Sequence, residues 1–284
     1  MAEERTAGEI EQEIRDYWRS AIIDMSPGRI RFSGYAIEDL MGNAGFADMV
    51  WLLTRGELPD RAQSVLLEAA LVAGVDHGPQ APSIGIARMA ITCGVGLNGA
   101  MGSAVNVLGD VHGGAGEQCM ELLVEIARRQ DDGAALDDAV SAGIDWYTET
   151  RSRFIPGYGH RFHTPVDPRS PRMLALADAA VADGCIDGRF VAIGRGVQEE
   201  LDRRKGKPVP MNIDGATAIV YAELGFPPPL ARGLFCLSRS VGILAHAWEQ
   251  KSQDVRIKGA TPKQYIWTYD GPPDRPVPDR DGSD

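Results

Sequence analysis

Apolar residues recur along most of the chain at the three- and four-residue spacing that places them on one face of an α-helix. Segments 47–54 and 60–73 show this spacing first, separated by the break between Gly56 and Pro59. Later segments with the same spacing begin at about residue 83 and continue over 116–129, 135–150, 172–183, 190–201, 214–224 and 232–250. The pattern predicts an all-α protein with at least eight helices.

Alternation of apolar and polar residues, which is typical of a half-buried strand, is confined to residues 22–35. Within this segment the run R-I-R-F at 29–32 follows the turn residues Pro27 and Gly28. We therefore expect at most one short hairpin near the N-terminus.

The last long helix, 232–250, has an apolar stripe that we predict to be buried. Arg239 lies off this stripe, between two serines. The stripe consists of Leu234, Leu237, Val241, Leu244 and Trp248.

Composition narrows the class of protein. The net charge of −11 disfavours nucleic acid as a partner, and no apolar run reaches the roughly 20 residues of a membrane helix. The acidic N-terminal residues have no hydrophobic segment of the kind found in a signal peptide, and the four cysteines have no C-x-x-C spacing. We expect a cytoplasmic protein without a membrane segment or a metal site.

One well-known functional motif occurs in the wrong structural context, and another is absent. Residues 94–99 formally match G-x-G-x-x-G, but the neighbourhood is helical, whereas dinucleotide binding requires a preceding buried strand. We interpret these glycines as helix-packing or turn positions. No G-x-S-x-G sequence occurs, which excludes a serine hydrolase of the nucleophile-elbow type.

Three of the five histidines, His77, His112 and His160, lie in glycine-containing loops. His112 precedes two glycines at a predicted helix entrance, where free backbone N–H groups and a neutral imidazole can face an oxyanion. His163 is close to His160 but lacks the glycine frame, and we expect His246, in the last long helix, to be structural.

A carboxylate and two arginines complete the candidate set. Asp214 lies near a predicted helix N-terminus, and Arg169 and Arg239 can bind carboxylates through two parallel hydrogen bonds. Such a set suits the making or breaking of a carbon–carbon bond next to a thioester. A carboxylate removes the α-proton, one histidine stabilises the enolate oxygen, and another protonates the acceptor ketone.

Five sequence blocks, in the same order, resemble the citrate synthase superfamily over roughly residues 20–265. The blocks are D-H at 76–77, V-H-G-G-A at 111–115 with Glu117, G-Y-G-H-R at 157–161 with D-P-R at 167–169, N-I-D at 212–214, and S-R-S-V-G at 238–242.

The resemblance implies three catalytic residues. Asp214 would be the base on the acetyl-CoA methyl group, and His112 would hydrogen-bond the enolate oxygen. His160 would bind and protonate the oxaloacetate carbonyl, or deprotonate the alcohol in the cleavage direction.

It also implies binding residues. His77, Arg169 and Arg239 would hold substrate carboxylates, and Arg256 would replace an arginine that the family supplies across its dimer. The basic residues before the Asp214 block would suit coenzyme A phosphates. These basic residues are Arg203, Arg204, Lys205 and Lys207.

The implied fold has a large helical domain, residues 17–155 with 230–270, and a small helical domain, residues 156–229. We expect residues 1–16 to form a flexible N-terminus and residues 271–284 to be a disordered tail. The family pattern further implies a homodimer whose sites use both chains, with higher assembly left open. Coenzyme A would be bound as a thioester substrate, and no tightly bound cofactor or metal is implied.

Within the superfamily the chain resembles the citryl-CoA lyase group, including the lyase module of ATP-citrate lyase. The segments D-H-G-P at 76–79, L-G-D at 108–110 and S-R-S-V-G-I-L-A-H-A-W-E-Q-K at 238–251 favour this group. The implied reaction converts citryl-CoA to acetyl-CoA plus oxaloacetate. Residues 162–164, and the segment R-I-K-G at 256–259 where the family has its late arginine block, leave another oxo acid open.

Two alternatives remain. A short citrate synthase would make citrate and coenzyme A from acetyl-CoA, oxaloacetate and water, and the presence of His112 favours it. A non-catalytic homologue that binds coenzyme A would have no chemical need for an intact Asp214, His112 and His160.

Overall fold

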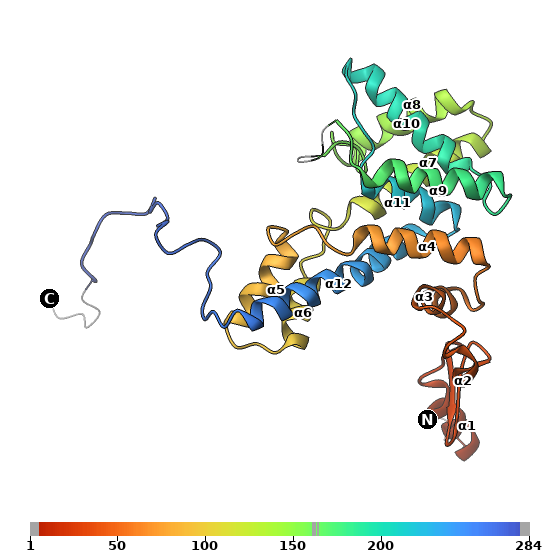
Figure 1. The fold of residues 1–284 in the computed structure, drawn as a ribbon, viewed down its shortest axis with the longest axis horizontal. Coiled ribbons are helices and arrows are strands. Elements are labelled where there is room, and N and C mark those ends of the chain that lie inside the picture. Colours follow the sequence, from red (N-terminus) through yellow and green to blue (C-terminus); the bar gives the residue numbers. More distant parts are fainter. Residues whose placement is uncertain (1–5, 161–162, 164, 279–284) are drawn as a thin grey trace, which may run out of the picture.

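The computed structural model describes residues 6–160, 163 and 165–278 (Figure 1). Twelve helices and one three-stranded sheet lie within these residues. The helices are α1 (Ala7–Asp16), α2 (Ile37–Leu40), α3 (Phe46–Arg55), α4 (Arg61–Gly74), α5 (Pro82–Thr92), α6 (Leu97–Val105), α7 (Ala115–Asp131), α8 (Leu136–Thr150), α9 (Arg169–Ala182), α10 (Arg189–Lys205), α11 (Ile213–Glu223) and α12 (Pro228–Ser252). The all-α prediction is confirmed.

The small sheet is the predicted N-terminal hairpin with one added strand. Strand β1 (Ile23–Ser26) pairs antiparallel with β2 (Arg29–Phe32), which pairs with β3 (Tyr35–Ala36). Gly28 takes a left-handed φ of 76° in the connecting turn, a conformation that glycine adopts without steric cost. The hairpin and α1 extend from one end of the helical body (Figure 1).

The glycine-rich segment 94–99 connects two helices. It follows α5, Gly96 is the N-cap of α6, and Gly94 has a φ of 87°. Because a helix and no strand precedes these glycines, the dinucleotide-binding interpretation is excluded and the turn interpretation holds.

Two hydrophobic clusters form the interior, and α12 runs through both (Figure 1). The larger cluster combines α3, α4, α7–α11 and the first part of α12, and Leu67, Leu122, Ile126, Ile193 and Ile219 are among its fully buried members. The smaller cluster joins α5 and α6 to the second half of α12. The larger cluster draws on both segments assigned to separate domains from the sequence, and that division stays a prediction.

Within the single chain, the prediction of a buried stripe on α12 is wrong. Of its five residues only Leu234 is buried, and Leu237, Val241, Leu244 and Trp248 are 42–60% exposed. The helix instead buries a different face, on which large residues alternate with small ones such as Ser238, Gly242 and Ala247. Gly242 approaches the turn after α4 so closely that an added Cβ would meet the Val75 carbonyl oxygen and lie 2.9 Å from the Asp76 carboxylate. The close approach of these two segments decides which face is buried, because no larger side chain fits there.

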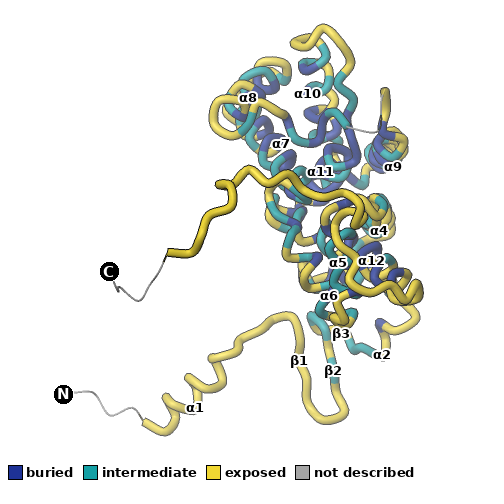
Figure 2. Tube along the Cα trace, turned by 90° about the vertical axis from the view of Figure 1, so that its left-hand side faces the viewer, coloured by how far each residue is buried: buried dark blue, intermediate teal, exposed yellow. Residues whose placement is uncertain are grey.

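The first and last described segments, residues 6–16 and 251–278, are exposed along their whole length (Figure 2). Helix α1 has a Thr6–Glu9 capping box and no buried residue, and residues 1–5 lie outside the described part. Residues 271–278 have no helix or strand, and residues 279–284 of the expected tail are likewise outside the description. Among the described residues no helix is both long and apolar enough to cross a membrane.

Candidate active site

Asp214 is the second residue of α11, and its position follows from how that helix begins. The N-cap Asn212 accepts hydrogen bonds from the backbone N–H of Asp214 at 2.9 Å and of Gly215 at 3.3 Å. The buried carboxylate of Asp167 accepts from the N–H of Ile213 at 3.1 Å. These side chains satisfy free N–H groups at the first turn and fix the direction of the helix entrance.

Burial raises the pKa of the Asp214 carboxyl, and the positive charges of Arg169 and Arg239 oppose that rise. The net shift is upward, although the helix N-terminus favours the carboxylate. A carboxylate whose pKa is raised toward the working pH is a stronger proton acceptor, which is what proton removal from carbon requires.

The His160 loop is held by backbone contacts to the segment before α11. The Gly159 N–H donates to the Pro210 carbonyl at 2.7 Å, and the Asn212 N–H donates to the Gly157 carbonyl at 2.9 Å. The Asn212 side-chain amide donates to the Gly159 carbonyl at 2.7 Å. Gly157 also packs directly on Gly215, so neither position has room for a Cβ. The loop and the start of α11 are therefore packed together as one unit.

Three imidazole rings gather at this loop. The ring centres of His77 and His160 are 5.5 Å apart, those of His160 and His163 4.5 Å, and those of His77 and His163 6.2 Å. The His163 N–H donates to His160 Nδ1 at 3.0 Å, so a neutral His160 has its proton on Nε2. Burial, followed by the charge of His163, lowers the His160 pKa. Residues 161, 162 and 164 of this segment lie outside the described part.

His112 is held in the opposite tautomer. Its Nε2 accepts a hydrogen bond from the Ser83 N–H at 3.2 Å and lies 3.0 Å from the Ser83 hydroxyl. A ring nitrogen that accepts from an amide is unprotonated, so a neutral His112 has its proton on Nδ1. Burial, then the charges of Arg239 and His77, lowers the His112 pKa and keeps the ring neutral.

The two arginines converge on the end of α4. Arg169 makes a two-pronged ion pair with Asp167, at 3.0 and 2.9 Å, and donates to the Ala73 carbonyl at 3.3 Å. The buried Arg239 donates from Nε to the next carbonyl, that of Gly74, at 3.1 Å. Both guanidinium groups therefore lie at the turn that leads to His77. Their charges, after burial, lower the pKa of that histidine.

Six of the residues selected from the sequence thus influence one another's ionisation. They are His77, His112, His160, Arg169, Asp214 and Arg239. Two donor histidines, a carboxylate and two cations can together generate an enolate and bind an anionic partner.

Arg256 lies elsewhere. It is exposed and lines a pocket of about 420 Å³ with Thr92, at the C-terminal end of α5. His112 contacts Ser83 at the other end of that helix, about 13 Å away along the axis at 1.5 Å per residue. Within the described part of this single chain Arg256 has no contact with the histidine site.

The basic residues at the end of α10 differ in whether they pair with acidic side chains. Arg203 pairs with Glu200 at 2.6 Å, and Arg204 pairs with Glu200 at 2.6 Å and with Asp145 at 2.5 Å. Lys205 and Lys207 are exposed.

Three residues that support the site were not selected from the sequence. Asn212 and Asp167 lie within the family blocks, and an Asn before a helix start is an identifiable capping signal. Ser83 has no such signal, because its contact with His112 spans 29 residues of sequence.

Comparison with known proteins places the site in context. Residues 60–259 match the family model described as citrate synthase, C-terminal domain. The structure of citryl-CoA lyase from Hydrogenobacter thermophilus is 33% identical, covers 92% of this chain and 97% of its own, and superposes with a TM-score of 0.80. ATP citrate lyase from Methanothrix soehngenii, solved with citrate and coenzyme A, is 20% identical with a TM-score of 0.75 over 94% of this chain and 45% of its own, which shows a shared fold.

Among curated proteins, the citrate synthase of Haloferax volcanii is 28% identical over 75% of this chain and 53% of its own length. The chain spans about half the length of the curated relatives it matches. Since the family model covers most of the chain and the lyase structure exceeds 30% identity over nearly all of it, this protein belongs to the citrate synthase family.

Proposed function

We propose that this protein is a citryl-CoA lyase, which splits citryl-CoA reversibly into acetyl-CoA and oxaloacetate. The observation that carries the proposal is the pair of histidines held in opposite tautomers, of which His160 lies close enough to Asp214 for its charge to act on that carboxyl. Each histidine has one ring nitrogen that accepts from a backbone N–H, which puts the proton of the neutral ring on the other nitrogen, from which it can be donated. The likeness to a citryl-CoA lyase over nearly the whole chain supports the same assignment.

The chemistry is simplest to follow in the condensation direction. Asp214 removes a proton from the methyl group of acetyl-CoA, and the electron pair moves into the thioester carbonyl. The Nδ1–H of His112 stabilises the enolate oxygen that results. The enolate carbon then bonds to the ketone carbon of oxaloacetate, whose oxygen is hydrogen-bonded by His160 and gains one proton as it becomes a hydroxyl. Cleavage passes through the same states in reverse.

Binding of the oxo acid follows from the charges at the turn after α4. Arg169 and Arg239 present guanidinium groups there, and His77 lies beside His160. Such a cluster suits a dicarboxylate, because Arg–carboxylate pairs combine charge with a planar two-point geometry. For coenzyme A we propose the exposed Lys205 and Lys207 as phosphate partners, with Arg203 and Arg204 contributing when their acidic partners release them.

Citrate synthase is the second candidate. The curated relatives with this name and the presence of His112 favour it. The two activities share the carbon–carbon step and differ only in whether the citryl thioester is hydrolysed.

The test is to supply purified protein with citryl-CoA and to follow oxaloacetate and free thiol in parallel. We expect oxaloacetate without thiol. Thiol together with citrate would instead identify a citrate synthase, because only hydrolysis releases free coenzyme A. If the folded protein gives neither signal, both activities are contradicted and a coenzyme A-binding role remains.

We also propose that the protein is a homodimer that covers the exposed face of α12. Leu237, Val241, Leu244 and Trp248 form an apolar stripe on this face, and a second copy would remove it from water. Val241→Asp should shift the protein from dimer to monomer in light scattering after size exclusion. Ile14→Asp, on the equally exposed α1, is the matched control and should stay dimeric. A dimer that survives Val241→Asp would contradict this face as the interface.

A further inference from the structure

One face of α12 holds the loop that carries His112. Arg232, Phe235 and Arg239 lie at positions i, i+3 and i+7 of the helix, a spacing that places their side chains along one side. All three point toward the segment 108–114 or toward the site it borders.

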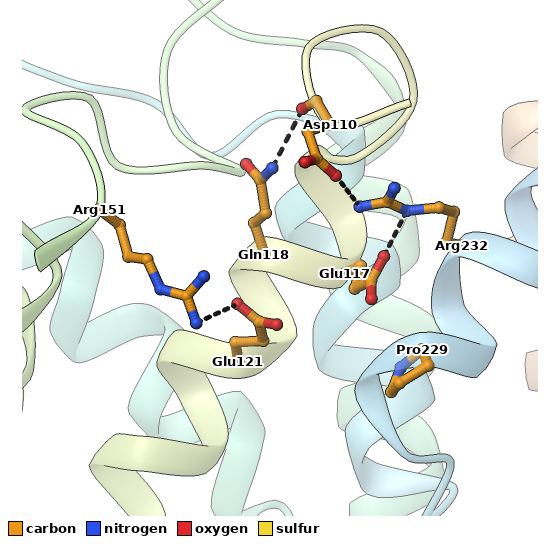
Figure 3. Close-up of a pocket in the computed structure, with 7 residues that line it drawn as sticks. All are labelled: Asp110, Glu117, Gln118, Glu121, Arg151, Pro229 and Arg232. Carbon is orange, nitrogen blue, oxygen red and sulfur yellow. Dashed lines mark hydrogen bonds and ion pairs between the residues drawn. The ribbon is translucent and has the colours of Figure 1, made fainter. Parts of the chain in front are cut away.

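Arg232 joins both ends of the loop (Figure 3). Its guanidinium is 2.6 Å from a carboxylate oxygen of Asp110, before His112, and pairs through Nε with Glu117, in the first turn of α7 after the loop. The side chain of Gln118 adds a hydrogen bond to the Asp110 carbonyl at 3.0 Å. One guanidinium group therefore links the part of the loop before His112 to the start of α7.

Phe235 supports the middle of the same loop. A Cβ on Gly113, which has a φ of 105°, would lie 3.1 Å from the Phe235 ring, and a Cβ on Gly114 would lie 2.7 Å from the Asp110 carbonyl oxygen. The Arg239 guanidinium lies over the Phe235 ring, 4.8 Å from its centre. The loop consequently has little room to shift while Arg232 holds its ends.

This contact differs from an ordinary surface ion pair, which contributes little. The side chain of Glu117 is only 16% exposed and that of Arg232 only 28% exposed, and one arginine serves two carboxylates. Removing Arg232 would leave the mostly buried Glu117 carboxylate without a cation, and the loop would lose the side chain that links its two ends.

We propose that Arg232 is a positioning residue for His112: through Asp110 and Glu117 it holds the loop so that Nε2 meets the Ser83 N–H and Nδ1–H faces the enolate oxygen. The inference rests on the proposed function, because it concerns the histidine assigned to the enolate. Helix α12 thereby carries two arginines with different roles. Arg239 binds the substrate, and Arg232 holds the His112 loop in place relative to it.

The kinetic test compares Arg232→Ala with Arg151→Ala. Arg151 lines the same pocket of about 390 Å³, but among the described residues its ion pair is with Glu121, at 3.6 Å, and not with the loop (Figure 3). For Arg232→Ala we expect kcat for citryl-CoA cleavage to fall about 10- to 100-fold with little change in KM, because a group misplaced by about 1 Å loses that much rate. Arg232→Lys should restore part of kcat, and Arg151→Ala should match the wild type. Equal kcat values per folded protein for both alanine variants would overturn the inference.

A second readout does not depend on turnover. In protein labelled with ¹⁵N-histidine, and with the His112 signal assigned through His112→Gln, the wild type should give the Nδ1–H tautomer. Arg232→Ala should give a mixture of tautomers, since the Ser83 contact is lost. If Arg232→Ala does not fold, Asp110→Ala tests the same fastening at a side chain that is 76% exposed. An unchanged tautomer in the folded variant overturns the inference even if the wild type fails to cleave citryl-CoA, whereas that failure alone would contradict only the proposed activity.

Discussion

The two histidine loops are held in place by different kinds of contact. The His112 loop is fastened by side chains that reach it from α5, α7 and α12, among them Ser83 and Arg232. The His160 loop is seated by backbone hydrogen bonds and by Gly157 lying on Gly215. Side-chain contacts can be removed one at a time, so we expect substitutions at the His112 loop to lower activity in graded steps. Apart from the Asn212 amide, the contacts of the second loop offer no side chain to remove, so we expect that loop to be lost largely as a unit.

The largest effect is expected from Gly215→Ala, which removes the seat of the His160 loop. The new Cβ would overlap the Gly157 carbonyl oxygen and lie 2.8 Å from the Met211 side chain. We expect the free energy of unfolding to drop by about 1–3 kcal/mol, as for an overpacked core, and cleavage to fall below detection. Urea denaturation and the citryl-CoA assay measure the two effects.

Gly116→Ala is the matched control for that variant. Gly116 lies in the first turn of α7, after the His112 loop, and a Cβ there would have an ordinary 4.0 Å contact with the Asp214 carbonyl oxygen. This control should keep full activity and stability. Equal losses in the two variants would show that the two loops do not differ in the way described.

Acid should destabilise both loops. His112 and His160 have pKa values below the ordinary 6.5, because burial disfavours their charged forms. A lowered pKa in the folded state contributes stability that is complete above the unfolded value of about 6.5 and is lost as the pH falls below it. Urea midpoints should therefore decrease from pH 7.5 to pH 5.5, and His112→Gln should make that decrease smaller. If the urea midpoint of the variant decreases as much as that of the wild type, protonation of His112 does not contribute to the loss of stability.

The smallest effect is expected from Ser83→Ala. The substitution removes the hydroxyl 3.0 Å from His112 Nε2 but keeps the backbone N–H that donates to the same nitrogen. Since one net hydrogen bond is worth about 0.5–1.5 kcal/mol, kcat should fall by no more than about 10-fold. A loss as large as that of Arg232→Ala would mean that the hydroxyl, and not the amide, orients the ring.

Much of the fold and of the candidate site could be predicted from the sequence, because both depend on local signals. Helical spacing predicted the all-α fold, and the alternating R-I-R-F run predicted the hairpin. Glycine-framed histidines and the capping pattern around Asp214 selected residues that meet in space.

The rest depended on contacts between distant segments. The wrong face of α12 was predicted to be buried within the chain. Apolar spacing alone does not reveal that Gly242 must meet the turn after α4. Arg232 and Ser83 have no local signal either, since their partners lie 122 and 29 residues away. The family pattern assigns Arg256 to the site of a partner chain, so its position at the far end of α5 in the single chain leaves that assignment a prediction.

The central claim, that Asp214 drives carbon–carbon chemistry between the two histidine loops, is tested most directly by comparing wild type and Asp214→Asn with citryl-CoA. The substitution keeps the size of the side chain and removes its ability to exchange the proton. We predict that the wild type releases oxaloacetate, and that the variant binds citryl-CoA but releases oxaloacetate at least about 100-fold more slowly. Oxaloacetate release at the wild-type rate by the variant would contradict the account.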